Sequence, residues 1–387
     1  MRDRTNLTLA KKAKNDEFYT QYEDVEAEMN AYLECNPKLF RNKVVLCPCD
    51  DPEWSNFTRY FSQNFERLGL KKFISTSYAP TRAAGHHGQP TLFETSSDKY
   101  DEALSNTRGR IFTLERDKTG DGRTDFHDIE WDYLDGDGDF RSDEVCSLRD
   151  KADIIITNPP FSLFREFLAW ILEATKPKQF ALIGNMNAIT YKEVFPLLQK
   201  DKMWLGTSNP KHFRDGTYTQ DATLKAFGNI CWYANIAHGR RNQPLSLMTK
   251  ADNIRFSKHK EVRDLGYQKY DNYDAIEVPY TDAIPSDHEG VMGVPITFLG
   301  KYCPDQFEIV GATQRGCHDL VPDLKKYDDY KEMRPDGTPT GSSGGKTNEN
   351  ANLKGNDGKK NYFINKNGHV VQSTYQRLFI KHRSTTK

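Results

Sequence analysis

The tetrapeptide Asn158-Pro159-Pro160-Phe161 has the residue types needed for chemistry on a planar amine. Two successive prolines lack backbone N–H donors and form a rigid turn that presents carbonyl oxygens. The Asn158 side chain adds an acceptor, and Phe161 adds an aromatic face that would stack on a heterocycle. An exocyclic amine that donates its hydrogens to the Asn158 side-chain oxygen and the Pro159 carbonyl keeps its lone pair for attack on an electrophile. The acceptors then stabilise the charge that develops, so no general base is needed.

The segments on either side place this turn at the edge of a sheet. Residues 152–157 contain three consecutive isoleucines and predict a buried strand, and the apolar residues of 161–172 have helical spacing. Open α/β sheets bind ligands at the carboxyl ends of their strands, which is where the turn would lie. The alternative is purely structural: the prolines begin the helix, and Asn158 is its N-cap.

Strand and helix patterns alternate along the first half of the chain, which predicts an α/β fold with a doubly wound, mostly parallel sheet in a domain of residues 1–206. Residues 79–150 are expected to be largely an insertion that contains a hairpin with arms at 110–115 and 125–131. The expected strands are residues 43–48, 72–78, 152–157, 180–184 and 203–206, and the expected helices are residues 54–68, 161–172 and about 190–200.

Residues 207–387 form the second expected domain, with short strands such as 230–236. A Gly-, Ser-, Asn- and Lys-rich stretch at 334–360 predicts a flexible loop. The 29 residues from Lys359 onward contain seven Lys and Arg and no Asp or Glu, which favours a polyanionic partner. The alternatives are a solvated tail, or a core strand over 375–381 whose charges merely face solvent.

Composition excludes several classes of protein. The 387 residues have a mean hydropathy of -0.78 and no long apolar run, so we expect no membrane-spanning segment. Seven scattered cysteines do not form a disulfide framework and favour a cytoplasmic location. Cys47 and Cys49 are too close together for a zinc pair, and the calcium-like loop 117–128 lies between strand patterns. We therefore expect no metal site.

Longer strings around the tetrapeptide resemble the EcoRI-type adenine-specific DNA methyltransferases, which depend on S-adenosylmethionine. The resemblance covers most of the chain except about 79–130, 207–228 and 311–370. The matching strings are residues 15–22, 44–52, 55–57, 136–142, 153–166, 188–194, 269–276 and 290–299.

This resemblance implies a Rossmann-like methyltransferase fold and a role for individual residues. Asn158, Pro159, Pro160 and Phe161 would be the catalytic motif. The cofactor-binding turn after the first strand departs from the usual pattern, because its glycines are replaced, and no carboxylate follows strand 72–78 to hold the cofactor ribose. The residues implied in cofactor binding are Phe18, Tyr19 and Thr20 at the methionine end, Cys49, Asp50 and Asp51 in the turn, and Asp139 and Phe140 at the adenine.

The implied activity is methyl transfer from S-adenosylmethionine to the N6 amine of a flipped-out adenine in double-stranded DNA. We expect a monomer that acts beside a cognate restriction endonuclease without contacting it. One alternative is methylation of amino groups in ribosomal RNA or protein, and another is a DNA-binding protein with an inactive cofactor site. The C-terminal region would recognise the target, with phosphate contacts expected from Lys359, Lys360, Lys366, Arg377 and Lys381.

Overall fold

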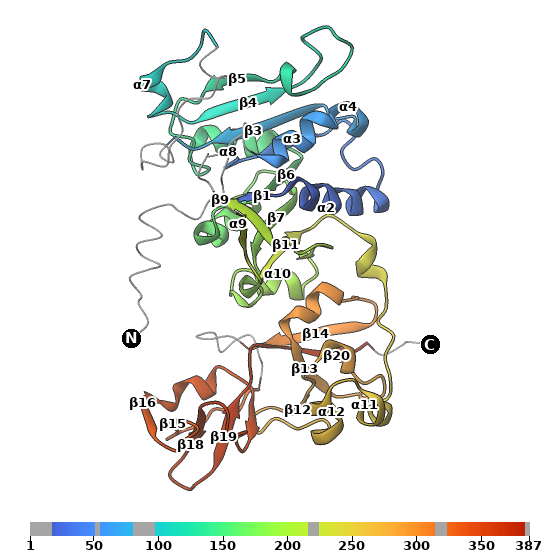
Figure 1. Cartoon of the computed structure of the whole chain (residues 1–387), viewed down its shortest axis with the longest axis vertical. Coiled ribbons are helices and arrows are strands. Elements are labelled where there is room, and N and C mark those ends of the chain that lie inside the picture. Colours follow the sequence, from blue (N-terminus) through green and yellow to red (C-terminus); the bar gives the residue numbers. More distant parts are fainter. Residues whose placement is uncertain (1–17, 51–54, 80–96, 216–223, 314–322, 384–387) are drawn as a thin grey trace. The chain divides into compact units, whose positions relative to one another are not determined.

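The computed structural model describes residues 18–50, 55–79, 97–215, 224–313 and 323–383 (Figure 1). The chain divides into two compact units. Unit 1 comprises Met1–Met186 and Met203–Gly239, and unit 2 comprises Asn187–Lys202 and Arg240–Lys387. Residues 207–239, expected in the second domain, therefore belong to unit 1, whereas 187–202 belong to unit 2. The division of function at residue 206 stays a prediction.

Unit 1 is built on an eight-stranded mixed sheet with the order β5-β4-β3-β2-β6-β7-β11-β8. The four central strands β3, β2, β6 and β7 are parallel, and the strands outside them are antiparallel. The expected α/β class is confirmed, although the parallel part is limited to the centre. The strands are β2 (Val44–Cys47), β3 (Lys72–Ser77), β4 (Arg110–Leu114), β5 (Glu130–Tyr133), β6 (Ile154–Thr157), β7 (Gln179–Asn185), β8 (Trp204–Leu205) and β11 (Ile230–Ala234).

Burial on both faces explains the apolar strand sequences. All four residues of β6 are buried, as are Val45 and Leu46 of β2, which is typical of parallel strands covered by helices. The expected helix 54–68 is two helices that meet at Asn64, and Gly69 ends the second in a left-handed conformation (φ 64°). The α-helices in the described part of unit 1 are α2 (Tyr22–Cys35), α3 (Asn56–Gln63), α4 (Phe65–Leu68), α7 (Glu102–Ser105), α8 (Asp143–Lys151) and α9 (Phe164–Leu172).

Two parts of the sheet differ from the sequence analysis. The hairpin β4–β5 extends the sheet, because β4 pairs with β3, and Figure 1 shows β3, β4 and β5 side by side. The second arm is shorter than expected, since residues 126–128 form a 3₁₀ turn. Strand β11, expected among the short strands of the second domain, lies between β7 and β8, and all five of its residues are buried.

A second sheet of unit 1 has the order β1-β9-β10. It joins β1 (Phe18–Thr20) to the antiparallel pair β9 (His212–Asp215) and β10 (Leu224–Ala226). Glu28 of α2 fixes the segment that leads into β9, because its buried carboxylate accepts hydrogen bonds from the backbone and hydroxyl groups of Thr207 and Ser208. Strand β1 is thus brought together with residues 207–215 and 224–226.

Unit 2 contains two sheets, with the orders β12-β13-β20-β14 and β16-β15-β18-β19-β17. Its strands are β12 (Ala275–Glu277), β13 (Val291–Pro295), β14 (Phe307–Ala312), β15 (Lys331–Met333), β16 (Pro339–Ser343), β17 (Asn352–Lys354), β18 (Tyr362–Ile364), β19 (Val370–Ser373) and β20 (Arg377–His382). Its α-helices are α10 (Phe195–Gln199), α11 (Lys250–Phe256) and α12 (Lys260–Leu265).

The stretch 334–360, expected as a flexible loop, contributes β16, a 3₁₀ turn at Gly344–Asn348 and β17. Gly344 permits close packing here, since a Cβ atom at this position would clash with the Tyr330 backbone oxygen. Asn352 also bonds internally, donating from its side chain to the Thr347 carbonyl at 2.7 Å. The Gly and polar residues of 334–360 therefore take part in packing and hydrogen bonding, and the segment is not the flexible loop that its composition predicted. Among the described residues, no helix is long and apolar enough to cross a membrane.

Candidate active site

The candidate site lies where β2 and β6 end, at the reversal of strand order in the main sheet. Strand β3, which follows β2 in sequence, pairs with one side of β2, and β6 pairs with the other side. Open α/β sheets bind ligands where the strand order reverses in this way. The Thr157 hydroxyl, at the end of β6, donates to the Pro48 carbonyl just after β2 at 2.6 Å. The two strand ends are therefore tied together.

The Asn158–Phe161 turn follows β6 directly. Pro160, rather than Asn158, is the N-cap of the 3₁₀ turn Phe161–Leu163 that precedes α9, so the alternative in which Asn158 caps a helix is not observed. The Pro160 carbonyl accepts from the Leu163 backbone N–H at 2.9 Å, while the Pro159 carbonyl accepts no backbone N–H from the residues that the structure describes. The Asn158 side chain is half-buried. That its oxygen and the Pro159 carbonyl accept from an amine stays a prediction.

Phe161 contacts a residue that the sequence analysis did not identify. Its ring lies edge to face with Phe227, with centroids 6.5 Å apart, and Phe227 in turn contacts the buried Phe213 at 5.6 Å. Phe227 is fixed at the base of the β9–β10 pair, where its backbone N–H donates to the Lys211 carbonyl at 2.9 Å. No periodic pattern in 207–228 indicated this contact, since it depends on pairing across the hairpin.

The expected cofactor residues of the N-terminal segment lie in β1. The Thr20 carbonyl accepts from the Asn56 side chain at 2.7 Å, which joins β1 to the first residue of α3. The Thr20 hydroxyl is buried and makes no hydrogen bond with any described residue. Tyr19 is half-buried, and the side chain of Phe18 lies outside the described part of the chain.

The turn after β2 forms without the glycines that are usual at this position in methyltransferases. Cys49 adopts the left-handed conformation that glycine favours, with φ 61°. Asp50 is buried, and its carboxylate accepts from the hydroxyl of Ser55, the N-cap of α3. The Asp50 backbone is held against β3, because its carbonyl accepts from the Ser75 hydroxyl at 2.7 Å. Asp51 lies outside the described residues.

Asp139 and Phe140 lie beside the end of β3. Ala79, just beyond β3, donates its backbone N–H to the Asp137 carbonyl at 2.8 Å, and Gly138 packs against Ser77. The Asp139 carboxylate receives two guanidinium hydrogen bonds from Arg141, at 2.6 and 2.9 Å. That interaction raises the pKa of Arg141. Phe140 is 3% exposed, with Phe167 and Trp170 rings around it at 5.0 and 5.7 Å.

The five basic residues expected at DNA occupy different environments in unit 2. Arg377 is buried in an ion pair with Glu277 at 2.6 Å, so the structure favours the core-strand alternative for this residue. Leu378 and Ile380 beside it are also buried. Lys366 pairs with Asp329 at 2.9 Å, and Lys381 pairs with Glu308 at 3.3 Å. Lys359 and Lys360 are exposed.

The described residues contain no group of three or more His, Cys, Asp or Glu side chains placed to hold a metal ion. In the calcium-like loop, the carboxylates accept backbone N–H groups instead, from Gly120 and Gly122 to Asp117 and from Lys118 and Thr119 to Asp128. Burial and the neighbouring Asp50 carboxylate raise the pKa of the Cys47 thiol, which disfavours the thiolate that binds metals.

Comparison with known proteins identifies a family. The model of the adenine-specific methyltransferase EcoRI family matches residues 6–383. Type II methyltransferase M.EcoRI of Escherichia coli is 41% identical over 327 residues, covering 80% of this chain and 90% of that protein. Type II methyltransferase M.MpnI of Mycoplasma pneumoniae is 34% identical over 321 residues, covering 78% and 83%. No solved structure matches the chain.

Proposed function

The chain belongs to the EcoRI family of adenine-specific methyltransferases, and on that premise we propose which groups carry out the reaction. The methyl donor is S-adenosylmethionine, the acceptor is the N6 amine of an adenine flipped out of duplex DNA, and the Asn158–Phe161 turn holds that amine. The observation that carries the proposal is the place of this turn: it leaves β6 at the reversal of strand order, tied to the end of β2 through Thr157.

Two acceptors in the turn would align the amine. Its hydrogens are donated to the Asn158 side-chain oxygen and the Pro159 carbonyl, so its lone pair points away from both. S-adenosylmethionine supplies an electrophilic methyl group on a sulfonium. Formation of the nitrogen–carbon bond would be matched by breaking of the sulfur–methyl bond, with the sulfur leaving as a neutral thioether. Positive charge then develops on nitrogen, and the two oxygens would stabilise it more strongly than they stabilise the neutral amine. The excess proton leaves to solvent once transfer is complete.

Residues of unit 1 suit the cofactor. The buried Thr20 hydroxyl is without a partner among the described residues, as expected of a group that binds a ligand. We assign Thr20 and Tyr19 to the methionine end, since aromatic and hydroxyl groups can hold a sulfonium and a carboxylate. Cys49 and Asp50 form the turn that approaches the cofactor, and Asp139 accepts from the amino group of its adenine. Phe140, which the resemblance assigns to packing on the ring of that adenine, is buried among Phe167 and Trp170, so we propose instead that it supports Asp139 from within the core.

Phe161 is proposed to stack on the flipped adenine, with Phe227 holding its ring from the edge. Phe161→Ala should weaken capture of the flipped base, whereas Phe161→Trp should keep part of the activity because it retains a π face. The fluorescence of 2-aminopurine at the target position reports flipping. Equal signals from wild type and Phe161→Ala would count against stacking.

Transfer of a labelled methyl group to duplex DNA, ribosomal RNA and protein tests the substrate. We expect transfer to adenine in DNA only. Transfer to RNA or protein would support the first alternative. Calorimetry with S-adenosylmethionine tests the second alternative, since a chain with an inactive cofactor site would bind DNA without binding the cofactor. The relatives named Type II methyltransferases lead us to propose that the chain works within a restriction–modification system.

A further inference from the structure

Tyr375 is the most exposed large hydrophobic or aromatic side chain among the described residues, at 71%. It lies in the turn between β19 and β20, and the Lys360 ammonium is 4.5 Å from the centroid of its ring. An aromatic ring left in water with a cation on one face resembles the surfaces that bind nucleic acids, where rings contact bases and ammonium groups contact phosphates.

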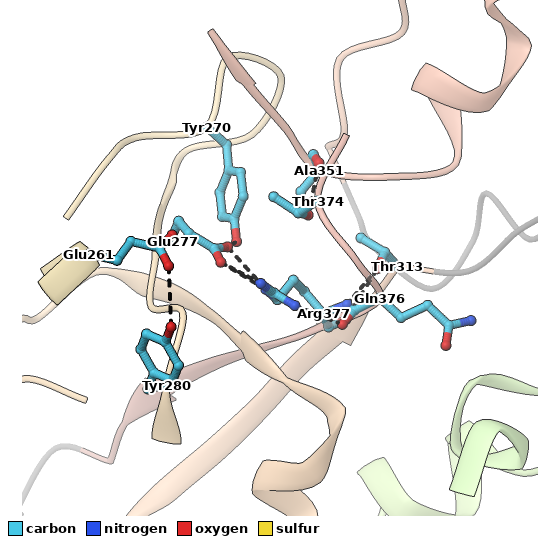
Figure 2. A network of polar contacts seen from close by, with 9 residues as sticks. All are labelled: Glu261, Tyr270, Glu277, Tyr280, Thr313, Ala351, Thr374, Gln376 and Arg377. Atoms are coloured by element: carbon cyan, nitrogen blue, oxygen red, sulfur yellow. Dashed lines mark hydrogen bonds and ion pairs between the residues drawn. The ribbon is translucent and has the colours of Figure 1, made fainter. Parts of the chain in front are cut away.

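The turn that carries Tyr375 is fixed on both sides. Thr374 donates from both its backbone N–H and its hydroxyl to the Ala351 carbonyl, each at 3.0 Å (Figure 2). On the other side, the Gln376 side chain donates to the Thr190 hydroxyl at 3.1 Å. Tyr375 is therefore exposed on a held backbone, so little conformational entropy of the main chain would be lost on binding.

A buried network fixes the nearby residue Arg377. Its guanidinium donates to Glu277 at 2.6 and 3.0 Å, and Tyr270 donates its hydroxyl to the same carboxylate (Figure 2). Burial, together with Glu277, raises the pKa of Tyr270, which keeps the phenol protonated as a donor. Gly293 makes room for this hydroxyl, since a Cβ atom at this position would clash with it. The network thus anchors the start of β20 beside the exposed ring.

The charge next to Tyr375 favours an anion. Among the described residues, Lys359 and Lys360 form no ion pair. The nearest acid in sequence, Asp357, already accepts from the backbone N–H groups of these two lysines and from the Gln372 side chain at 2.8 Å. The Gln372 hydrogen bond and the charge of Lys360 lower the pKa of the Asp357 carboxyl, so Asp357 offsets part of the positive charge, but it holds neither ammonium group in an ion pair.

A second exposed ring in unit 2 provides a contrast. Phe256 is 61% exposed, and the Arg255 guanidinium lies 4.9 Å from its centroid. However, the basic residues of its helix α11 and the adjoining α12 (Lys250, Arg255, Lys260 and Arg263) lie among Asp252, Glu261 and Asp264, and Lys260 pairs with Asp264 at 4.0 Å. The lysines beside Tyr375 are not paired in this way with any described residue.

We propose that Tyr375, Lys359 and Lys360 form a contact with duplex DNA separate from the catalytic turn, in which the Tyr375 ring packs on a base or deoxyribose and the two lysines bind phosphates. The inference rests on the proposed function, because DNA is the substrate named there. It assigns an aromatic anchor to the second unit.

Titration of the full-length protein against a fluorescein-labelled duplex tests this contact. Tyr375→Ala should weaken binding by about tenfold, in line with an aromatic–base contact, while Tyr375→Phe should bind within about twofold of wild type. Phe256→Ala is the matched control and should bind like wild type. Circular dichroism verifies that each variant is folded.

Methyl transfer at saturating DNA separates this inference from the proposed function. Tyr375→Ala should reach the wild-type maximal rate once DNA saturates it. Wild-type affinity in folded Tyr375→Ala, or an equal loss in Phe256→Ala, would overturn the proposed contact. If wild type binds the duplex but transfers no methyl group to it, the proposed function fails instead.

Discussion

The Asn158–Phe161 turn and the C-terminal segment from Lys359 are both conspicuous in the sequence. In the structure, the turn keeps one environment, whereas the basic residues of the segment lie in several. The turn keeps the place expected for it, after a buried strand and before a helix. The five basic residues of the segment that were expected at DNA separate into the buried Arg377, two lysines paired with acids, and the exposed pair Lys359 and Lys360. A motif between a recognisable strand and helix predicts where its residues lie in the fold. A bias in composition does not predict where each residue lies.

The largest effect is expected within β20, where two ion pairs differ in burial. Glu277→Ala should lower the free energy of unfolding by about 3–5 kcal/mol, because it leaves the Arg377 charge buried without its partner. Glu308→Ala, which breaks the half-exposed pair with Lys381, should cost at most about 1 kcal/mol. Urea denaturation measures both. Equal, small losses would mean that Arg377 is free to serve as a surface cation after all.

At the Asn158–Phe161 turn, which we propose to be catalytic, Asn158→Ala should reduce the rate of methyl transfer by roughly 100- to 1,000-fold, as for the removal of one oxyanion-type hydrogen bond. Cofactor affinity should change little, because Asn158 acts mainly as charge develops. Single-turnover kinetics and calorimetry measure the two quantities. A rate within tenfold of wild type would contradict the role given to the Asn158 oxygen.

Asp139→Ala should raise the dissociation constant of S-adenosylmethionine by roughly tenfold or more, as expected for a hydrogen bond to a charged group. Turnover at saturating cofactor should fall less, because the proposed partner is the cofactor adenine and not the reacting centre. Asp137→Ala is the matched control, since its carboxylate accepts from the Asp139 backbone N–H at 3.0 Å. Normal binding by Asp139→Ala with weak binding by Asp137→Ala would shift the assignment to Asp137.

The smallest effect compares lysines within the C-terminal segment. Replacing Lys359 and Lys360 with alanine should flatten the slope of log affinity against log salt by roughly 0.9 for each phosphate that the variant no longer binds. The same change at Lys366 and Lys381 should alter the slope less, since Asp329 and Glu308 already neutralise these cations. Equal changes in both double variants would show that all four lysines bind phosphates, as composition alone predicts.

Sequence patterns predicted the central strands and the turn at Asn158–Phe161 because both depend on local residues. Three isoleucines buried on both faces and two prolines after them specify a strand and a turn without reference to the rest of the chain. The place of β11 depends on pairing with β7 and β8, and the contact between Phe161 and Phe227 depends on a hairpin, so neither follows from local spacing. The burial of Arg377 does not follow from local spacing either, since its partner Glu277 lies 100 residues away.

The most direct test is sequencing of genomic DNA for N6-methyladenine from cells that express the wild-type chain or Asn158→Ala at equal levels. We predict modified adenines at one short sequence with the wild type and none above background with Asn158→Ala. Unmodified DNA despite folded wild-type protein would contradict adenine methylation by this chain. Equal modification by both proteins would contradict the central role of the Asn158–Phe161 turn.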